Sequence, residues 1–234
     1  MNYESLLELV KTRRSIKKFK PDPVPDEYVD KIIEVARWAP SGANSQPWEF
    51  IVVRNQELRE SLISIWQESS NLVHRTELTR EPETRFPMYR KPPQGRPRFA
   101  DAPVFIVVCG DPRTRAAYPL SAFLNRGPSI YNSSLASVFL YIHLAATTLG
   151  LGSQWLTSSG NPLEASLIKQ LLGIPLEMDI YDVVALGYPD VTPKPRLVRA
   201  REEMVHYDHY DKTKLRTEQQ VKDFIATLYG GGPF

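Results

Sequence analysis

The stretch RWAPSGANSQPWEF, Arg37–Phe50, decides how the chain is read, because its loop is longer and more polar than a simple connection requires. Before it, residues 26–38 place apolar side chains at helical spacing. After it, residues 49–53 form an apolar, β-branched run that is typical of a strand. A helix and a strand can be joined by about two to six residues, with no need of two carboxamides between two prolines. We therefore expect the loop Pro40–Pro47 to have a binding role.

Two interpretations of this loop stay open from its residues alone. Asn44 and Gln46 each offer a donor and an acceptor on a planar amide, which suits the edge of a flat heterocycle such as a pyrimidine or a flavin. Pro40, Ser41 and Gly42 would let the backbone approach such a ring closely. Alternatively, the amides cap the preceding helix and pin the turn.

Upstream of the loop, the segment KTRRSIKKFKPDPVP, Lys11–Pro25, concentrates positive charge at the end of a predicted helix. Four cations crowd around Ser15: Arg13, Arg14, Lys17 and Lys18. The helix dipole accounts for one or two of them, and a solvated basic face for the rest. Guanidinium, ammonium and hydroxyl donors within five residues can also bind a phosphate dianion through charge-assisted hydrogen bonds.

The rest of the pattern predicts helices and short apolar strands. Predicted helices cover residues 3–11, 26–38, 129–149 and 217–229, and predicted strands cover 49–53, 103–109 and 178–189. Asp26 is suited to cap the second helix. Residues 129–149 are apolar on nearly every side, so we expect this helix to be buried on all faces and not to span a membrane.

Composition limits the class of protein. The chain has 234 residues, of which 42% are hydrophobic, and a formal net charge of +2, so nothing global indicates nucleic acid. The single cysteine, Cys109, lies in an apolar run and fits a reduced compartment. The N-terminus lacks the basic and apolar regions of a secretory signal, and we expect a cytoplasmic protein.

The segment from 75 to 98 contains seven Arg or Lys residues, three Glu and five prolines, so we expect an irregular excursion over the surface. Its aromatic residues make it the best candidate for a substrate lid, although a solvated loop explains the same charges. The lid residues would be Phe86, Met88, Tyr89, Arg90 and Phe99.

Taken together, RRSIKKF and, about twenty residues later, APSGANSQPWEF resemble the N-terminal signature of the nitroreductase family of flavoenzymes. The resemblance continues through GLGSQWLTS and DVVALGYP to a late basic PKPRLVR. It implies an α+β fold with a central, mostly antiparallel sheet flanked by helices, in an intertwined homodimer with FMN at the subunit interface. On this basis residues 1–234 form one domain, with a lid insertion at 75–98 and a C-terminal arm at 200–234.

The resemblance also assigns cofactor-binding residues. Arg13, Arg14, Ser15 and Lys17 match the positions that hold the FMN phosphate and ribityl chain. Pro40, Ser41, Gly42, Asn44 and Gln46 match a loop that contacts the flavin, largely from the opposite subunit. Trp155, Leu156, Thr157 and Ser158 match the segment along the flavin ring, and either Arg196 or Arg199 completes the phosphate site.

The expected activity is a ping-pong transfer of electrons from NADH or NADPH through FMN to a small aromatic oxidant such as a nitroaromatic or quinone, or to an activated alkene. The flavin carries the chemistry, so the protein needs no nucleophile, and a cation such as Lys17 would stabilise the reduced ring. We expect no metal site, because His206 and His209 fit an exposed polar arm better. Alternatives are a reductive dehalogenase of the iodotyrosine type, a flavin-cleaving enzyme of a cobamide pathway, and a flavin or nucleic-acid binding module that uses the basic lid.

Overall fold

The computed structural model describes residues 2–86, 89–193 and 196–228. Of these, residues 2–67 and 96–193 form one compact unit, and residues 68–86, 89–95 and 196–228 form a second. Each unit is described by itself below. The prediction of a single domain with a lid and an arm stays a prediction.

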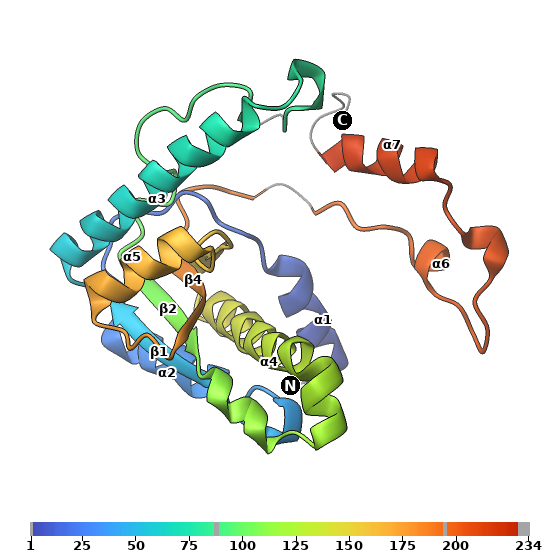
Figure 1. The fold of residues 1–234 in the computed structure, drawn as a ribbon, viewed down its shortest axis with the longest axis horizontal. Helices are drawn as coiled ribbons and strands as arrows, with labels where there is room; N and C mark the ends of the chain where they lie inside the picture. The colour runs from blue at the N-terminus through green and yellow to red at the C-terminus, as the bar shows by residue number, and fades with distance from the viewer. Residues whose placement is uncertain (1, 87–88, 194–195, 229–234) are drawn as a thin grey trace. The chain divides into compact units, whose positions relative to one another are not determined.

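A four-stranded antiparallel sheet in the order β1-β2-β4-β3 forms the centre of the first unit (Figure 1). Its strands are β1 (Trp48–Val53), β2 (Val104–Gly110), β3 (Gly152–Leu156) and β4 (Asp179–Gly187). Every residue of β2 is buried, as expected for a β-branched run in mid-sheet. The three predicted strands are confirmed within two residues at each end, whereas β3 was not predicted, because it begins with the small and polar residues Gly152–Gln154.

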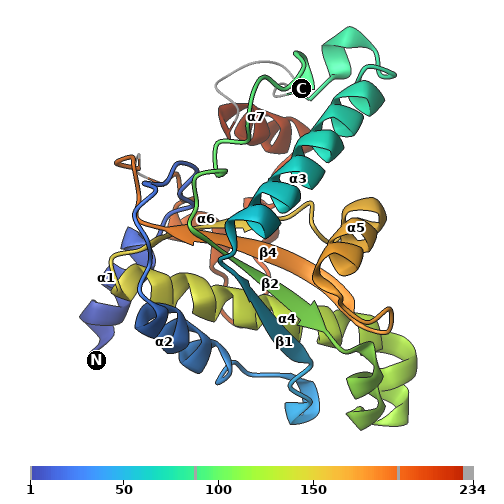
Figure 2. The same ribbon diagram turned by 90° about the vertical axis from the view of Figure 1, so that its left-hand side faces the viewer.

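Helices cover both faces of the sheet (Figure 2). On one face, α2 (Asp26–Ala36) and α4 (Leu120–Thr148) pack against inward-facing residues of β2 and β4. On the other, the first turns of α3 (Gln56–Glu77) and α5 (Pro162–Leu172) do the same. The buried thiol of Cys109 belongs to this second layer, and burial raises its pKa to about 12.

The long helix α4 differs from its prediction in two ways. It begins at Leu120 instead of Ser129, and it includes Pro128. It is also not buried on all faces within one chain, because only one side packs on the sheet and α2, while Asn132, Ser133 and Leu140 are exposed. Besides polar residues, the solvent side of α4 carries the exposed apolar residues Leu120, Phe123, Leu124 and Leu140.

Two helix starts show how local chemistry sets the bounds. In α1 (Tyr3–Thr12), Asn2 is the N-cap and its side chain accepts a hydrogen bond from the Ser5 N–H at 2.9 Å. In α2 the N-cap is Pro25, without a side-chain cap bond. The prediction that Asp26 caps this helix is wrong, because the fixed φ of Pro25 places the next residue already inside the first turn.

The second unit contains the end of α3, the 3-10 turns Pro82–Thr84 and Lys212–Lys214, and the helices α6 (Arg201–Met204) and α7 (Glu218–Leu228). The predicted helix at 217–229 is confirmed as α7, with Tyr229 outside the described residues. The predicted irregular excursion begins only after Glu77, since 75–77 continue α3. In the part of the chain that the structure describes, no helix is long and apolar enough to span a membrane.

Candidate functional site

Residues 13–20 form a basic strap that runs beside the free edge of β3. The Ile16 N–H donates to Ser153 O at 3.0 Å, and the Lys20 N–H donates to Tyr188 O at 2.9 Å. Ile16 and Phe19 are 5% and 2% exposed and enter the core, so the charged side chains between them are turned to the surface. The sequence folds this way because apolar residues at spacing three anchor an otherwise hydrophilic strap.

The cations of the strap have different surroundings. Lys18 forms a 2.6 Å ion pair with Asp190, and the hydrogen bond to that carboxylate raises the pKa of Lys18. Arg14 donates to the backbone oxygens of Lys11 and Arg13, which fixes the turn at the end of α1. Lys17 is exposed. Arg13, Arg14 and Lys17 therefore share the surface of one short segment, as a phosphate site requires.

A buried histidine supports the strap from behind. His143 of α4 is 5% exposed, and its Nδ1 lies 2.7 Å from the hydroxyl oxygen of Ser153, the residue whose carbonyl holds Ile16. Burial, with the charge of Arg13 as a second cause, lowers the pKa of His143 to about 4. The imidazole is thus neutral at physiological pH. Sequence reasoning missed this role, although a histidine inside an apolar helix was a visible signal.

The predicted ring-binding segment, Trp155–Ser158, lies at the end of β3. Trp155 stacks on Phe139 of α4, with ring centroids 4.5 Å apart and an interplanar angle of 28°. Leu156 is buried, whereas Thr157 and Ser158 are exposed. The edge strand thus carries these two hydroxyl residues from the core to the surface.

Two buried carboxylates that the sequence analysis did not single out lie next to this segment. Asp182 of β4 accepts hydrogen bonds from Trp155 Nε1 at 2.7 Å and from the Gly160 N–H at 3.2 Å. Glu164 of α5, 1% exposed, accepts one from Ser158 Oγ at 3.0 Å. Burial raises the pKa of Asp182 to about 6. An acid that interrupts an apolar strand pattern was the signal that could have found Asp182.

The loop Pro40–Pro47 has a strained backbone. Ala43, Asn44 and Gln46 have φ values of 51°, 51° and 43°, in the left-handed region that non-glycine residues rarely occupy. Such strain persists only where the surroundings hold the backbone in place, and it is found preferentially at ligand sites. This geometry agrees with a binding role for the loop.

The loop is anchored to the middle of α4. The Gly42 N–H donates to Ser134 Oγ at 3.1 Å, and a Cβ at Gly42 would lie 2.1 Å from Ile130 Cγ2, so only glycine fits. The end of α2 is closed by backbone bonds from Trp38 and Ala39, not by the carboxamides. The carboxamides therefore do not cap α2, but the Gln46 side chain donates to Asn44 O at 3.4 Å and so helps to pin the turn, and the choice between the two interpretations stays open.

The loop and the strap are held at different places on one helix. Ser134, which binds the loop, and His143, which supports the strap through Ser153, are about two and a half turns apart on α4. This corresponds to about 14 Å along the axis. Within one chain, the strap meets β3 at Ser153, near the beginning of the strand, and the loop is anchored to a different part of α4.

The late arginines belong to the second unit. Arg199 donates from Nε to Glu203 Oε2 and from Nη2 to Glu203 O, both at 3.3 Å, and Arg196 is exposed. Arg199 is therefore engaged by its own arm. Which arginine reaches a phosphate stays a prediction.

The predicted lid residues separate into two groups. In the second unit, the rings of Phe86 and Tyr89 lie 6.0 Å apart, and His74 Nδ1 is 2.8 Å from Tyr89 O. Arg90 donates to Arg85 O at 3.3 Å, and Met88 lies outside the described residues. Phe99 belongs instead to the first unit, where it packs edge-on against Trp66 and Phe105 in the core. The lid role of the first group stays a prediction, whereas the position of Phe99 indicates a structural role.

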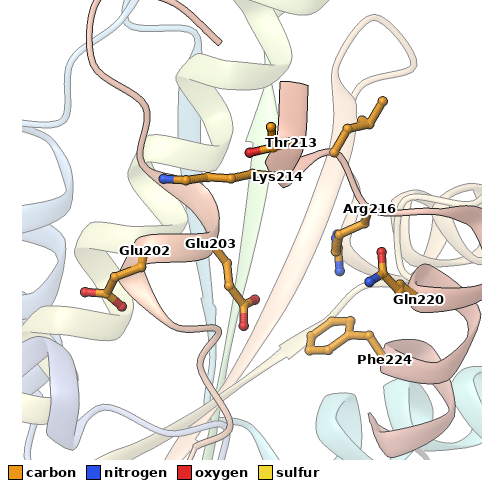
Figure 3. Close-up of a pocket in the computed structure, with 8 residues that line it drawn as sticks. Glu202, Glu203, Thr213, Lys214, Arg216, Gln220 and Phe224 are labelled. Carbon is orange, nitrogen blue, oxygen red and sulfur yellow. The ribbon is translucent and has the colours of Figure 1, made fainter. Parts of the chain in front are cut away.

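Each unit also has a surface cavity that includes a residue named above, Glu203 in one and Lys18 in the other. One, of about 510 Å³, is in the second unit (Figure 3), where the Arg216 guanidinium lies 5.4 Å from the centre of the Phe224 ring. It is lined by Glu202, Glu203, Thr213, Lys214, Leu215, Arg216, Gln220 and Phe224. The other, of about 320 Å³, is lined by Lys18, Arg96, Pro97, Arg98, Ala100 and Asp101. Arg96 already forms a two-pronged pair with Glu60, at 2.7 and 3.0 Å.

Comparisons with known proteins agree with this geometry. Residues 10–188 match the model of the nitroreductase family. A protein of Methanothermobacter thermautotrophicus, named provisionally as an NADH dehydrogenase or NAD(P)H nitroreductase, is 34% identical over 82% of this chain and 81% of its own. The iodotyrosine deiodinase of Thermotoga neapolitana is 28% identical over 88% of this chain and 98% of its own. The structure of a nitroreductase with bound FMN from Desulfitobacterium hafniense superposes with a TM-score of 0.65 and 28% identity, covering 89% of this chain and all of that one.

Proposed function

The chain belongs to the nitroreductase family, and from this premise we propose that it is an FMN-dependent oxidoreductase that takes electrons from NAD(P)H and passes them to a small electron-poor compound. When bound, FMN supplies the redox chemistry, accepting hydride from the nicotinamide and returning electrons to the oxidant. The protein's part is to bind and orient the cofactor and both substrates.

The residues present fit the phosphate of FMN. The strap presents guanidinium, ammonium and hydroxyl donors from one segment, in which Ser15 and Lys17 are exposed and Arg13 and Arg14 are half-buried. Arg13, Arg14, Ser15 and Lys17 would hold the phosphate and the ribityl chain. Such a donor set suits a dianion better than it suits a neutral ligand.

One observation carries the proposal: the hydrogen bond from Ile16 N–H to Ser153 O places the strap directly beside the strand that ends in Trp155–Ser158. The basic strap and the strand that leads into the ring-binding segment, far apart in the sequence, thereby become neighbours at Ser153. A phosphate and an isoalloxazine ring belong to one molecule, so the residues that bind them must be neighbours too.

The third group supports a homodimer. Pro40, Ser41, Gly42, Asn44 and Gln46 are held about 14 Å further along α4, so they fit a site in which a second copy supplies this loop. The exposed apolar residues of α4, among them Leu124 at 69% and Leu140 at 50%, are what a second copy would cover.

For the oxidant we propose a nitroaromatic, a quinone or an activated alkene, with Phe86 and Tyr89 as residues of its lid. Stacking on aromatic rings favours a flat substrate, and basic residues around them favour a phenolate or an acid. The buried thiol of Cys109 is consistent with the cytoplasmic location expected from the sequence.

A second candidate is reductive dehalogenation of a halophenol, favoured by the similarity to the deiodinase of Thermotoga neapolitana. The set of Glu, Tyr and Lys with which deiodinases bind an amino acid zwitterion cannot be placed in the lid sequence. The nitroreductase interpretation therefore comes first.

The test is the visible spectrum of the purified protein, followed by anaerobic titration with NADH and with NADPH. Oxidised flavin that bleaches with either donor, and is reoxidised by nitroaromatics or quinones, supports the proposal. Flavin that resists both donors but is reoxidised by 3-iodotyrosine after dithionite reduction would favour the dehalogenase. A protein that stays colourless after incubation with FMN overturns both.

A further inference from the structure

The two buried carboxylates described above, Asp182 and Glu164, accept hydrogen bonds that fix the turn that follows β3. At its beginning, Trp155 donates to Asp182 at 2.7 Å, and near its end the Gly160 N–H donates to the other oxygen of the same carboxylate at 3.2 Å. Between them, Ser158 donates to Glu164 at 3.0 Å and Trp66 donates to Ser159 Oγ at 3.0 Å. The turn is thus tied to β4, α5 and α3.

Packing leaves little room for another arrangement. Asp182 is 8% exposed, and the Trp155 ring that it holds is stacked on Phe139. A Cβ at Gly160 would lie 2.6 Å from the Tyr181 carbonyl oxygen, so the backbone passes too close to β4 for any other residue. Thr157, in the middle of the turn, is exposed. The fixed turn therefore presents Thr157 to the surface.

We propose that Asp182 is a positioning residue that, by holding Trp155 and Gly160 at once, fixes the turn in the conformation that receives the flavin ring. This inference rests on the proposed function and adds to it a residue outside the predicted cofactor site. Asp182 acts through the turn, without touching the cofactor itself.

A carboxylate is required because two N–H donors must be accepted at one place. An asparagine offers one carbonyl oxygen, and its amide nitrogen cannot accept the second N–H. The ionised form also makes both bonds charge-assisted and therefore stronger. Asp182→Asn keeps the size of the side chain and removes one acceptor and the charge.

Several groups around Asp182 affect whether its carboxyl group is ionised. Glu164 of α5 disfavours its ionisation, and the donors Trp155 and Gly160 favour it. On its own strand, Tyr181 has a pKa raised first by burial and then by Asp182. His143 of α4 lies on the far side of Trp155, with ring centroids 6.1 Å apart, and is neutral. Ionised Asp182 should hold the turn most firmly above about pH 6.

The first test uses the apoprotein and needs no flavin. In ¹⁵N-labelled protein, the indole N–H signal of Trp155, assigned by its absence in Trp155→Phe, is followed from about pH 5 to about pH 8. We expect the signal of the wild type to shift with a midpoint near pH 6, and we expect no such shift in Asp182→Asn. The control is Glu177→Gln, which removes an exposed acid just before β4 and should titrate like the wild type. An indole N–H signal at about pH 8 that is the same in wild type and in Asp182→Asn overturns the clamp.

The second test measures FMN affinity by titrating the apoproteins at about pH 7.5. We expect Asp182→Asn to weaken binding by about tenfold or more, the effect of losing one charge-assisted hydrogen bond, with Glu177→Gln unchanged. Wild-type affinity should fall more steeply below about pH 6 than that of Asp182→Asn, whose remaining pH dependence is that of the FMN phosphate. Equal affinity in wild type and Asp182→Asn overturns the proposal.

If circular dichroism shows that Asp182→Asn is not folded, a third variant, Trp155→Phe, takes its place in the test. Trp155→Phe retains a stacked ring on Phe139 and removes only the donor. It should weaken FMN binding in the same direction, and unchanged affinity in this variant contradicts the proposal. If the wild type binds no FMN at all, the proposed function fails, while the indole titration still reports separately on the clamp.

Discussion

The imidazole of His143 lies 2.7 Å from the hydroxyl of Ser153, and this buried contact joins the long helix α4 to the edge strand that holds the basic strap. Helix, strand and strap are thereby coupled through one uncharged histidine. A proton on His143 would place a cation in the core, near Arg13.

We expect the folded protein to lose stability in acid because of His143. Its pKa of about 4 in the folded protein is below the ordinary value of 6.5, so the unfolded chain binds more protons between these values. The free energy of unfolding should therefore fall as the pH falls from about 6.5 to about 4. Urea unfolding of wild type and His143→Gln should show a smaller fall in the variant, with exposed His209→Gln as the control. Parallel curves for all three proteins would contradict this assignment.

The strap can be tested by removing its charges. Arg13→Ala combined with Lys17→Ala should release FMN during gel filtration, because the phosphate loses two charge-assisted partners. Lys11→Ala combined with Lys20→Ala removes the same charge from exposed neighbours and should retain the flavin. Retention of FMN by the first variant with unchanged affinity would refute the phosphate site.

We expect the effects of substitutions at Gly42 and Ile130 to be coupled. Gly42→Ala places a methyl group 2.1 Å from Ile130 Cγ2, so the loop must shift, at a cost of about 1–3 kcal/mol and of flavin affinity. Gly42→Ala combined with Ile130→Ala removes the clash and should recover part of both losses. A double-mutant cycle, measured once by thermal unfolding and once by FMN titration, gives the coupling energy between the two positions. Strict additivity of the two substitutions would argue against contact between the residues.

Phe86 and Phe99 should respond differently to truncation. Phe99→Ala opens a cavity beside Trp66 and Phe105 and should destabilise the protein by about 3 kcal/mol in urea, with modest effects on KM. Phe86→Ala should leave stability within about 1 kcal/mol and raise the KM for the oxidant, since it removes a ring from the proposed lid. If Phe86→Ala leaves the oxidant KM unchanged, the lid assignment is wrong.

Local patterns were enough to predict most of the sheet. β1, β2 and β4 are apolar and β-branched, which predicts strands, and the burial of β2 and β4 in mid-sheet follows from composition. β3 escaped prediction because its first residues are glycine, serine and glutamine, and its place is set by pairing with β4. Helix α4 was cut short because Pro128 reads as a break, whereas in the structure it lies within the helix.

The candidate site was predictable only where a motif carried it. The strap and the end of β3 were named from the sequence, but their adjacency depends on one long-range backbone bond, Ile16 to Ser153. Asp182 and His143 look like ordinary polar interruptions of apolar runs, and only the fold shows that each supports a predicted segment. The position of Phe99 in the core likewise follows from contacts distant in sequence.

The strap has a consequence for colloidal behaviour. β3 is the outermost strand on its side of the sheet, and unpaired backbone groups on such a strand are a template for joining another molecule. The strap pairs with some of these backbone groups, at Ser153. Whatever loosens the strap therefore also exposes unpaired backbone groups of β3. If the strap binds the flavin phosphate as proposed, flavin retention and resistance to aggregation should rise and fall together.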